Sequence, residues 1–328
     1  MLRIAAQGLI AGTLLVMLYY APGAVLRELQ FVVTILIVTV ATRSMRSSSG
    51  LSALGLGLGI VVFLAVGAGY LMTKAGLDLG AGFTNWGLVP IVEEALKLSP
   101  VLLAAAVLQR RHRLTPNPSD LLMLGCAAGA GFALSENVAL VQGSLSAARD
   151  MELQYGPHLA GFYLVPGAWG TAGYVGHAAA TGFIAGGYGL GRALQDRLGA
   201  RWWIVPAVCA AWIAIEHMFV NLYVNSGSSF ALIFGNGALT PWLFVMLATA
   251  IVALDALRLT ATLARSRMLS WRVNLARAAM LRMKPPVPRS RAVAVQLYVS
   301  QLRLVNATGW CALRAGPEGP RHQKVETL

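Results

Sequence analysis

The chain has 328 residues, of which 57% are hydrophobic and only 12% are charged, with 35 glycines. About a quarter of the residues of a soluble domain are charged, so this composition excludes an ordinary soluble enzyme and indicates an integral membrane protein. The net charge of +13 belongs to the C-terminal tail, because residues 258–328 hold 13 Lys and Arg but two acids. Residues 1–257 hold 13 basic and 11 acidic residues, so the membrane region itself is close to neutral.

Eight apolar segments are predicted, with the lengths of membrane-spanning helices rather than the roughly ten-residue alternating strands of an outer-membrane barrel. We therefore predict an all-α polytopic membrane protein with a conical or bundled core. The first segment follows Arg3 and ends before Pro22 without a convincing cleavage pattern, which favours a retained span over a signal peptide. The segments cover about residues 4–21, 25–42, 51–73, 87–108, 121–143, 160–190, 202–224 and 231–257.

The loops between these segments alternate in charge. Cytoplasmic loops hold the excess of Lys and Arg, and here the loops before segments three, five and seven and the tail after segment eight are basic. The intervening loops hold one basic residue each, Arg27, Lys74 and Arg149, or none. This alternation predicts that both termini are cytoplasmic.

The sixth segment is longer than one span needs and contains Pro166 with several glycines. Proline removes a helix hydrogen bond, so a steep tilt, a kink or an irregular entry is expected there. Pairs of small residues four apart, Gly125 with Gly129 and Gly182 with Gly186, predict close packing of the fifth and sixth segments.

The tail after the last segment is basic. Arg258, Arg265 and Arg272 recur every seven residues, which predicts a basic amphipathic helix on anionic lipid of the cytoplasmic leaflet. No nucleic-acid recognition motif accompanies the charge, so a nucleic-acid partner is not expected. The expected parts are N-terminal helices in 1–85, a core in 86–257, the basic helix in 258–284 and a partly disordered tail in 285–328.

Glu93, Glu94 and Lys97 lie inside the fourth predicted span. Ionisable side chains at bilayer depth are costly, so they face a protein interior or a water-filled cavity and commonly mark function. On a helix, Lys97 lies four residues after Glu93 and three after Glu94, so its ammonium reaches either carboxylate. One helix face is thus predicted to carry two acids and a base.

Three further spans also contribute polar residues. Each of Glu93, Glu136 and His217 lies about seven or eight residues from the outer end of its helix, which corresponds to roughly 10–12 Å. Equal depth on antiparallel helices predicts one convergent site in the outer half of the membrane. Taken singly, such residues also serve as interhelical hydrogen-bonding groups, and Glu94 with Lys97 as a buried ion pair. The additional polar residues are Glu136, Asn137, His177, Glu216, His217 and Asn221.

This set of residue types is suited to activating water. Repulsion between two adjacent carboxylates in a medium of low dielectric constant keeps one protonated while the other serves as a base. A glutamate general base with imidazole to bind or protonate an oxyanion makes a competent hydrolase. No serine or cysteine nucleophile motif is present and no HExxH occurs, although histidines and glutamates from separate helices can still bind a metal.

Four motifs occur in order along the chain: Glu93-Glu94-xx-Lys97, Phe132-xxx-Glu136-Asn137, His177, and His217-xxx-Asn221. Together they resemble the motifs of PrsW-type intramembrane proteases, relatives of the glutamate-dependent prenyl-protein (CAAX) proteases. The resemblance covers about residues 86–224. It implies a multi-helical peptidase that cleaves membrane-anchored proteins near the outer surface, including anti-sigma regulators for some members. The expected location is the inner membrane of a bacterium.

The resemblance also implies roles for these residues. Glu93 or Glu94 would activate water, His177 would be a second catalytic group, and His217 with Asn221 would assist water binding or stabilise the oxyanion. Glu136 would complete the site, with Lys97, Asn137 and Phe132 in support.

The same residues suit a metal-free and a metal-assisted mechanism. The metal-free mechanism is favoured and no cofactor is expected, but a divalent metal such as zinc, held by His177, His217 and Glu94, is not excluded. One alternative function is a proton-coupled transporter, because intramembrane Glu, His and Lys also build proton relays. Another is a non-catalytic prenyl-protease-like scaffold.

Overall fold

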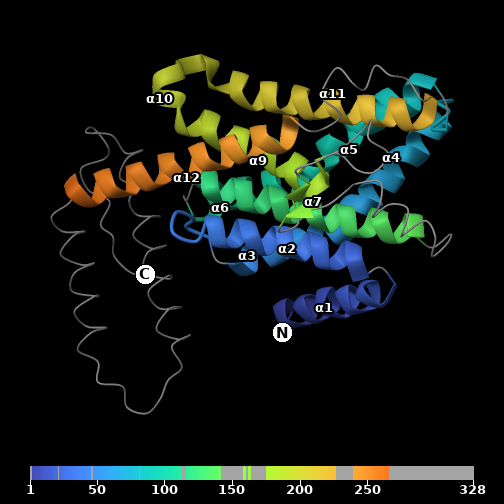
Figure 1. The fold of residues 1–328 in the computed structure, drawn as a ribbon, viewed down its shortest axis with the longest axis horizontal. Coiled ribbons are helices and arrows are strands. Elements are labelled where there is room, and N and C mark those ends of the chain that lie inside the picture. Colours follow the sequence, from blue (N-terminus) through green and yellow to red (C-terminus); the bar gives the residue numbers. More distant parts are fainter. Residues whose placement is uncertain are drawn as a thin grey trace, which may run out of the picture.

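The computed structural model describes residues 2–20, 22–45, 47–80, 82–112, 116–141, 158–159, 162–163, 175–226 and 239–265. These residues are helical apart from turns and one hairpin of two-residue strands, which confirms the predicted all-α class (Figure 1). Elements η1 and η2 are π-helical and η3 is a 3-10 helix. In chain order the elements are α1 (Leu2–Tyr20), α2 (Pro22–Val38), α3 (Ser47–Leu56), η1 (Gly57–Val61), α4 (Val62–Lys74), η2 (Thr84–Leu88), α5 (Val89–Lys97), α6 (Ser99–His112), α7 (Pro118–Val141), β1 (His158–Leu159), β2 (Phe162–Tyr163), α9 (His177–Ala193), α10 (Gln195–Leu198), η3 (Gly199–Trp203), α11 (Ile204–Ser226) and α12 (Leu239–Arg265).

Helix α7 is the centre of the bundle. It packs against α2, α3, α9 and α12, which surround it in Figure 1. In its apolar span, Pro118–Glu136, 94% of the residues of the most apolar stretch are buried. In the other three described helical stretches long enough to cross a membrane, this share is 22% each. Those three expose their apolar side chains, as expected of helices that face lipid, and α7 is the helix that they enclose.

The start of α7 is fixed by a reciprocal capping arrangement. The Asn117 side chain accepts a hydrogen bond from the Asp120 amide at 2.7 Å, and the Asp120 carboxylate accepts one from the Asn117 amide at 3.1 Å. Pro118 occupies the first helical position, where its missing amide hydrogen costs nothing. The Asp120 carboxylate also accepts a hydrogen bond from the amide of Ser44. The Asp255 carboxylate of α12 accepts one from the Ser119 hydroxyl at 2.6 Å. Helix α7 is thereby tied to α12 and to the turn after α2.

Small residues bring the backbones of α7 and α9 into contact, as predicted. A methyl group at Gly125 would lie 2.8 Å from the carbonyl oxygen of Thr181, and one at Gly129 would overlap the carbonyl oxygen of His177. Gly182 packs against the sulfur of Cys126 in the same way. Cys126 and Cys209 are buried free thiols, as expected of small apolar residues.

The sixth predicted segment, 160–190, is not one continuous helix. Strands β1 and β2 form an antiparallel hairpin in which Leu159 pairs with Phe162. Helix α9 begins at His177, directly after Gly176, whose φ of 86° is readily adopted only by glycine. The predicted irregular entry is therefore confirmed, while Pro166 lies outside the described residues. As a result, His177 is the first residue of a helix rather than a mid-helix residue.

The fourth predicted segment, 87–108, is interrupted. Helix α5 ends at Lys97 and α6 begins at Ser99, with Leu98 in a turn between them. Pro100 has no amide hydrogen and cannot continue the helical hydrogen-bond ladder across this point. The charged helix α5 is thus a short element of its own.

Within the described residues, four helical stretches are long and apolar enough to cross a membrane: Ser48–Lys74, Pro118–Glu136, Gln195–Leu222 and Leu239–Thr260. The chain is an integral membrane protein, and the count of eight spans stays a prediction. Helix α12 continues to Arg265, past the predicted boundary at residue 257, and Arg258 donates a hydrogen bond to the carbonyl oxygen of Ala193. The remainder of the predicted basic helix and the tail lie outside the described residues.

The close approach of α7 to α9 makes the first testable prediction. Replacing Gly129 by Ala inserts a methyl group where the His177 carbonyl lies, and we expect the free energy of unfolding to fall by about 1–3 kcal/mol, a typical cost of overpacking. Gly67→Ala on α4 is the matched control, because nothing lies within 4 Å of the added methyl group there. Thermal unfolding in detergent measures both variants, and equal unfolding midpoints would contradict the described packing.

Candidate functional site

Helix α5 presents Glu94 and Lys97 to the protein interior. The lysine Nζ lies 2.6 Å from Glu94 Oε1, and the two side chains are 0% and 5% exposed. The predicted contact between residues three apart on a helix is therefore present. Glu93, on the neighbouring face of the same turn, is 19% exposed and contacts His217 rather than Lys97 among the described side chains.

His177 links α5 to α7. Its Nδ1 lies 2.6 Å from Lys97 Nζ, and its Nε2 lies 2.5 Å from Glu136 Oε2. An ammonium group only donates hydrogen bonds, so Nδ1 is the acceptor and the ring proton is on Nε2, facing the Glu136 carboxylate. The position at the start of α9 allows the ring to reach both neighbours.

His217 of α11 contacts the two glutamates of α5. Its Nδ1 lies 2.9 Å from Glu94 Oε1, and its Nε2 lies 3.9 Å from Glu93 Oε2. Glu94 Oε1 therefore accepts from both Lys97 and His217, which leaves this carboxylate enclosed. The Glu93 carboxylate is held only loosely by comparison.

Aromatic contacts fix the two imidazoles. The rings of His177 and His217 lie 5.4 Å apart between centroids, edge to face, and the ring of Phe132 lies 5.1 Å from His177. Lys97 Nζ is 5.1 Å from the centre of the Phe132 ring, within range of a cation–π contact. Phe132 thus packs against both the histidine and the lysine.

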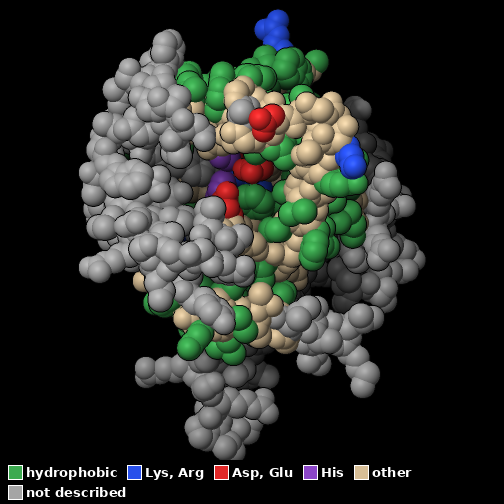
Figure 2. All heavy atoms as spheres, turned by 90° about the vertical axis from the view of Figure 1, so that its right-hand side faces the viewer, with side chains coloured by type: hydrophobic (Ala, Val, Ile, Leu, Met, Phe, Trp, Pro, Cys, Tyr) green, Lys and Arg blue, Asp and Glu red, His purple; other side chains and the backbone are tan. Residues whose placement is uncertain are grey.

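The site opens at one face of the molecule. Figure 2 shows acidic and histidine side chains at the bottom of a hollow lined by apolar side chains. Among the described side chains, Glu136 is 33% exposed and Glu93 19%, whereas Glu94 and Lys97 are 5% and 0% exposed. Glu93 and Glu136 are therefore the carboxylates that water in the hollow reaches.

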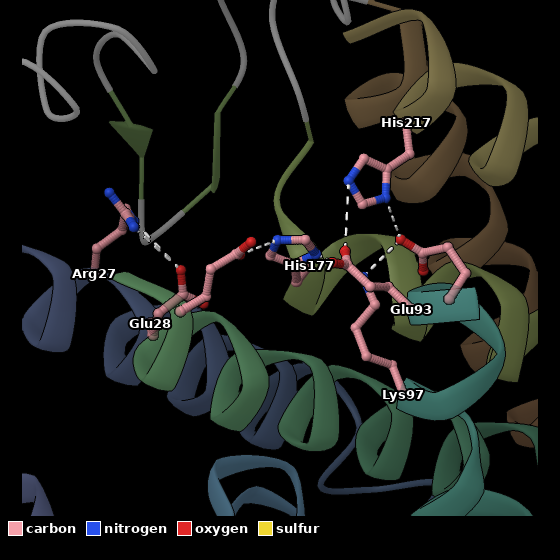
Figure 3. A network of polar contacts seen from close by, with 8 residues as sticks. Arg27, Glu28, Glu93, Lys97, His177 and His217 are labelled. Carbon is pink, nitrogen blue, oxygen red and sulfur yellow. Dashed lines mark hydrogen bonds and ion pairs between the residues drawn. The ribbon is translucent and has the colours of Figure 1, made fainter. Parts of the chain in front are cut away.

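Helix α2 adds an ion pair that the sequence analysis missed. Arg27 and Glu28 are buried, with Arg27 Nη2 3.4 Å from Glu28 Oε1. Figure 3 shows Glu28 and Glu93 on opposite sides of His177. Arg27 had been counted as a loop charge, although two adjacent charges in an apolar helix were a signal of burial.

Five helices thus bring eight ionisable side chains together, here called the polar cluster. The structure unites Glu93, Glu136 and His217, whose shared depth predicted one site, with Glu94 and His177. Asn221 lies one turn after His217 on α11 and is partly buried, Glu216 is buried outside the cluster, and the Asn137 side chain lies outside the described ones. The cluster consists of Arg27, Glu28, Glu93, Glu94, Lys97, Glu136, His177 and His217.

Three members of the cluster fit a metal ion. One ligand atom each of Glu94, His177 and His217 lies within 4.8 Å of the others. Two imidazoles and one carboxylate form a donor set known from catalytic zinc sites. His177 also donates its Nε2 proton to Glu136, which is the outer contact that orients metal-binding histidines. The type and number of these ligands, and the contact of His177 with Glu136, therefore fit a site for a divalent metal.

Comparison with known proteins places the chain in a family. The model of the PrsW family intramembrane metalloprotease matches residues 47–254. Comparisons with curated proteins and with solved structures gave no match. The matched region is more than half of the chain and contains every cluster member except Arg27 and Glu28. The chain thus belongs to the PrsW family of intramembrane metalloproteases.

Proposed function

We propose that the protein is an intramembrane endopeptidase that hydrolyses peptide bonds of membrane-anchored proteins with water activated by a glutamate. The observation that carries the proposal is the convergence of Glu93, Glu94, Glu136, His177 and His217 from four helices at the base of a hollow. Carboxylates and imidazoles within reach of one another and of water are what general acid–base hydrolysis requires. Family membership supports the peptidase class.

Glu93 is the base that activates water in this proposal. Its carboxylate is partly exposed in the hollow, and its Oε2 lies 3.9 Å from His217 Nε2. Glu94 is unsuited to that role, because Lys97 and His217 already donate to its Oε1. The two adjacent glutamates thus divide the work: Glu94 holds the site together, and Glu93 takes the proton from water.

Glu136 and His177 form the second functional pair. The carboxylate holds the Nε2 proton of His177 at 2.5 Å and fixes the ring orientation. Because Glu136 is the most exposed carboxylate of the cluster, it also borders the space that a peptide would occupy. Asn221, one turn after His217 on α11, is assigned to assist water binding or oxyanion stabilisation.

Glu94, His177 and His217 are the residues that would hold a divalent metal. A metal there would act as a Lewis acid on the scissile carbonyl. The clustering of these ligands and the family description favour a metal-assisted mechanism over the metal-free one favoured from sequence.

The substrate is proposed to be a membrane-anchored protein, with anti-sigma-type regulators as one class. The proposed setting is eight spans in the inner membrane of a bacterium, with both termini cytoplasmic and the hollow in the outer half of the bilayer. The basic tail is proposed to bind anionic lipid. Exposed apolar side chains on α4, among them Phe63, Val66 and Tyr70, support a surface that faces lipid, through which an anchored substrate approaches.

Exchanges of Glu93 and Glu94 for Gln separate chemistry from support. Glu93→Gln is expected to lower the cleavage rate of a single-pass substrate by about 10²-fold or more, because a general base is lost, with the unfolding midpoint unchanged. Glu94→Gln is expected also to destabilise the fold by about 3–5 kcal/mol, because Lys97 loses its buried partner. Purified protein in detergent serves for both measurements.

Glu216→Gln is the control for these exchanges, because Glu216 is buried on α11 outside the polar cluster. It should cleave at the wild-type rate. Wild-type cleavage by Glu93→Gln would rule out Glu93 as the base. Absence of cleavage by the folded wild-type protein would favour the transporter or scaffold alternatives.

Metal removal tests the metal-assisted mechanism. A strong chelator is expected to abolish cleavage by the wild-type protein, and added zinc to restore it, because Glu94, His177 and His217 hold the ion. Metal content is measured on the same samples. Undiminished cleavage by protein shown to be free of metal would contradict the metal-assisted mechanism and support the metal-free one, in which a glutamate alone activates water.

Cysteine labelling tests the proposed topology. Asp78 lies in the exposed turn after α4 and Ala200 in the exposed η3. With Cys311 replaced by Ser, Asp78→Cys is expected to react with a membrane-impermeant thiol reagent in intact cells, and Ala200→Cys only after permeabilisation. The buried thiols of Cys126 and Cys209 should stay silent. Reversed labelling would overturn the outward orientation of the hollow.

A further inference from the structure

Lys97 lies among the candidate metal ligands. Its side chain is fully buried, and its Nζ lies 2.6 Å from Glu94 Oε1 and 2.6 Å from His177 Nδ1. Glu94 and His177 are two of the three residues whose ligand atoms cluster. An ammonium group therefore already contacts two of the groups that a metal would use.

The contacts of His177 identify the atom in competition. Its Nε2 is engaged by Glu136 at 2.5 Å, so Nδ1 is the nitrogen left for a metal. Lys97 donates to that same nitrogen. Histidines that bind metals commonly donate their other ring N–H to a carboxylate, as Nε2 of His177 does to Glu136. Here the lone pair of Nδ1 accepts a hydrogen bond from Lys97 instead of binding a metal.

We propose that Lys97 competes with a divalent metal for Glu94 and His177 and has to withdraw from them before an ion binds both residues together. Zinc takes nitrogen and carboxylate ligands at about 2.0–2.2 Å, which is closer than the 2.6 Å contacts of Nζ. A lone pair that accepts a hydrogen bond from the ammonium does not bind the ion, and the two positive charges repel each other.

The ammonium also has a third contact. Its Nζ lies 5.1 Å from the centre of the Phe132 ring, a cation–π contact that involves neither Glu94 nor His177. Lys97 thus neutralises Glu94 and orients His177 while no metal is present. It sets the metal affinity of the site without being a ligand itself.

This inference rests on the proposed metal site but is tested by metal binding rather than by cleavage. Lys97→Met keeps the length of the side chain and removes its charge, and Lys97→Arg keeps the charge. Lys74→Met, at the exposed end of α4, is the matched control for loss of one lysine. Zinc affinity is measured for the full-length proteins in detergent by competition with a chromophoric chelator.

The expected result is that Lys97→Met binds zinc at least about tenfold more tightly than wild type, because a competing positive charge is gone. Lys74→Met should match wild type, and Lys97→Arg should not bind more tightly. An affinity of Lys97→Met equal to or below that of wild type overturns the proposal, whatever the variants do in a cleavage assay. Loss of zinc binding in His217→Ala then shows separately whether the proposed metal site exists.

The uncompensated Glu94 could prevent Lys97→Met from folding without metal. The variant is then expressed and purified with zinc present, where the ion takes over the charge that Lys97 supplied. Folding that depends on zinc, seen as a monodisperse peak that zinc restores, supports the proposal. A variant that stays unfolded with and without zinc overturns it, since the ion then does not replace the lysine.

Discussion

The buried contact between Lys97 and Glu94 is the constraint on which the site depends. A buried ammonium is stable only if its partners are in place, and those partners come from α5 and, through His177, from α9. His217 of α11 shares the same Glu94 oxygen. Each helix that moves away leaves a buried charge or polar group with fewer contacts, so the pair favours one relative arrangement of three helices. The pair therefore serves as much to specify geometry as to stabilise the fold.

The scaffold meets this constraint through backbone packing. Glycines on α7 let the backbone of α9 approach until the carbonyl oxygen of His177 lies against Gly129, so α7 fixes the first turn of α9. Helix α7 is itself held by the capping contacts of Asn117 and Asp120 at one end. At its other end it presents Glu136 to His177. The position of the His177 backbone thus follows from close helix packing, and side-chain contacts then orient its ring.

Much of this site was predictable from sequence, because charged residues in apolar membrane helices face the protein interior or a water-filled cavity rather than lipid. The shared depth of Glu93, Glu136 and His217 correctly brought three helices together. The depth of His177 was not predictable, since it depends on where α9 begins, and that point is set by Gly176 rather than by apolar periodicity. Arg27 was misassigned because a charge near the end of a span fits a loop, although the adjacent Glu28 already indicated a buried pair.

The charges of the polar cluster explain why a site occupied by a lysine still suits a divalent metal. Three carboxylates, Glu93, Glu94 and Glu136, surround the two histidines with one lysine, Lys97, among them, so acidic groups are in excess over fixed cations there. A divalent ion balances that excess, and in a medium of low dielectric constant such balance decides which ions are retained. Arg27 and Glu28 compensate each other and leave the excess among the carboxylates around the two histidines. The attraction comes from the whole cluster, whereas the competition is confined to the one position next to Glu94 and His177 that Lys97 occupies.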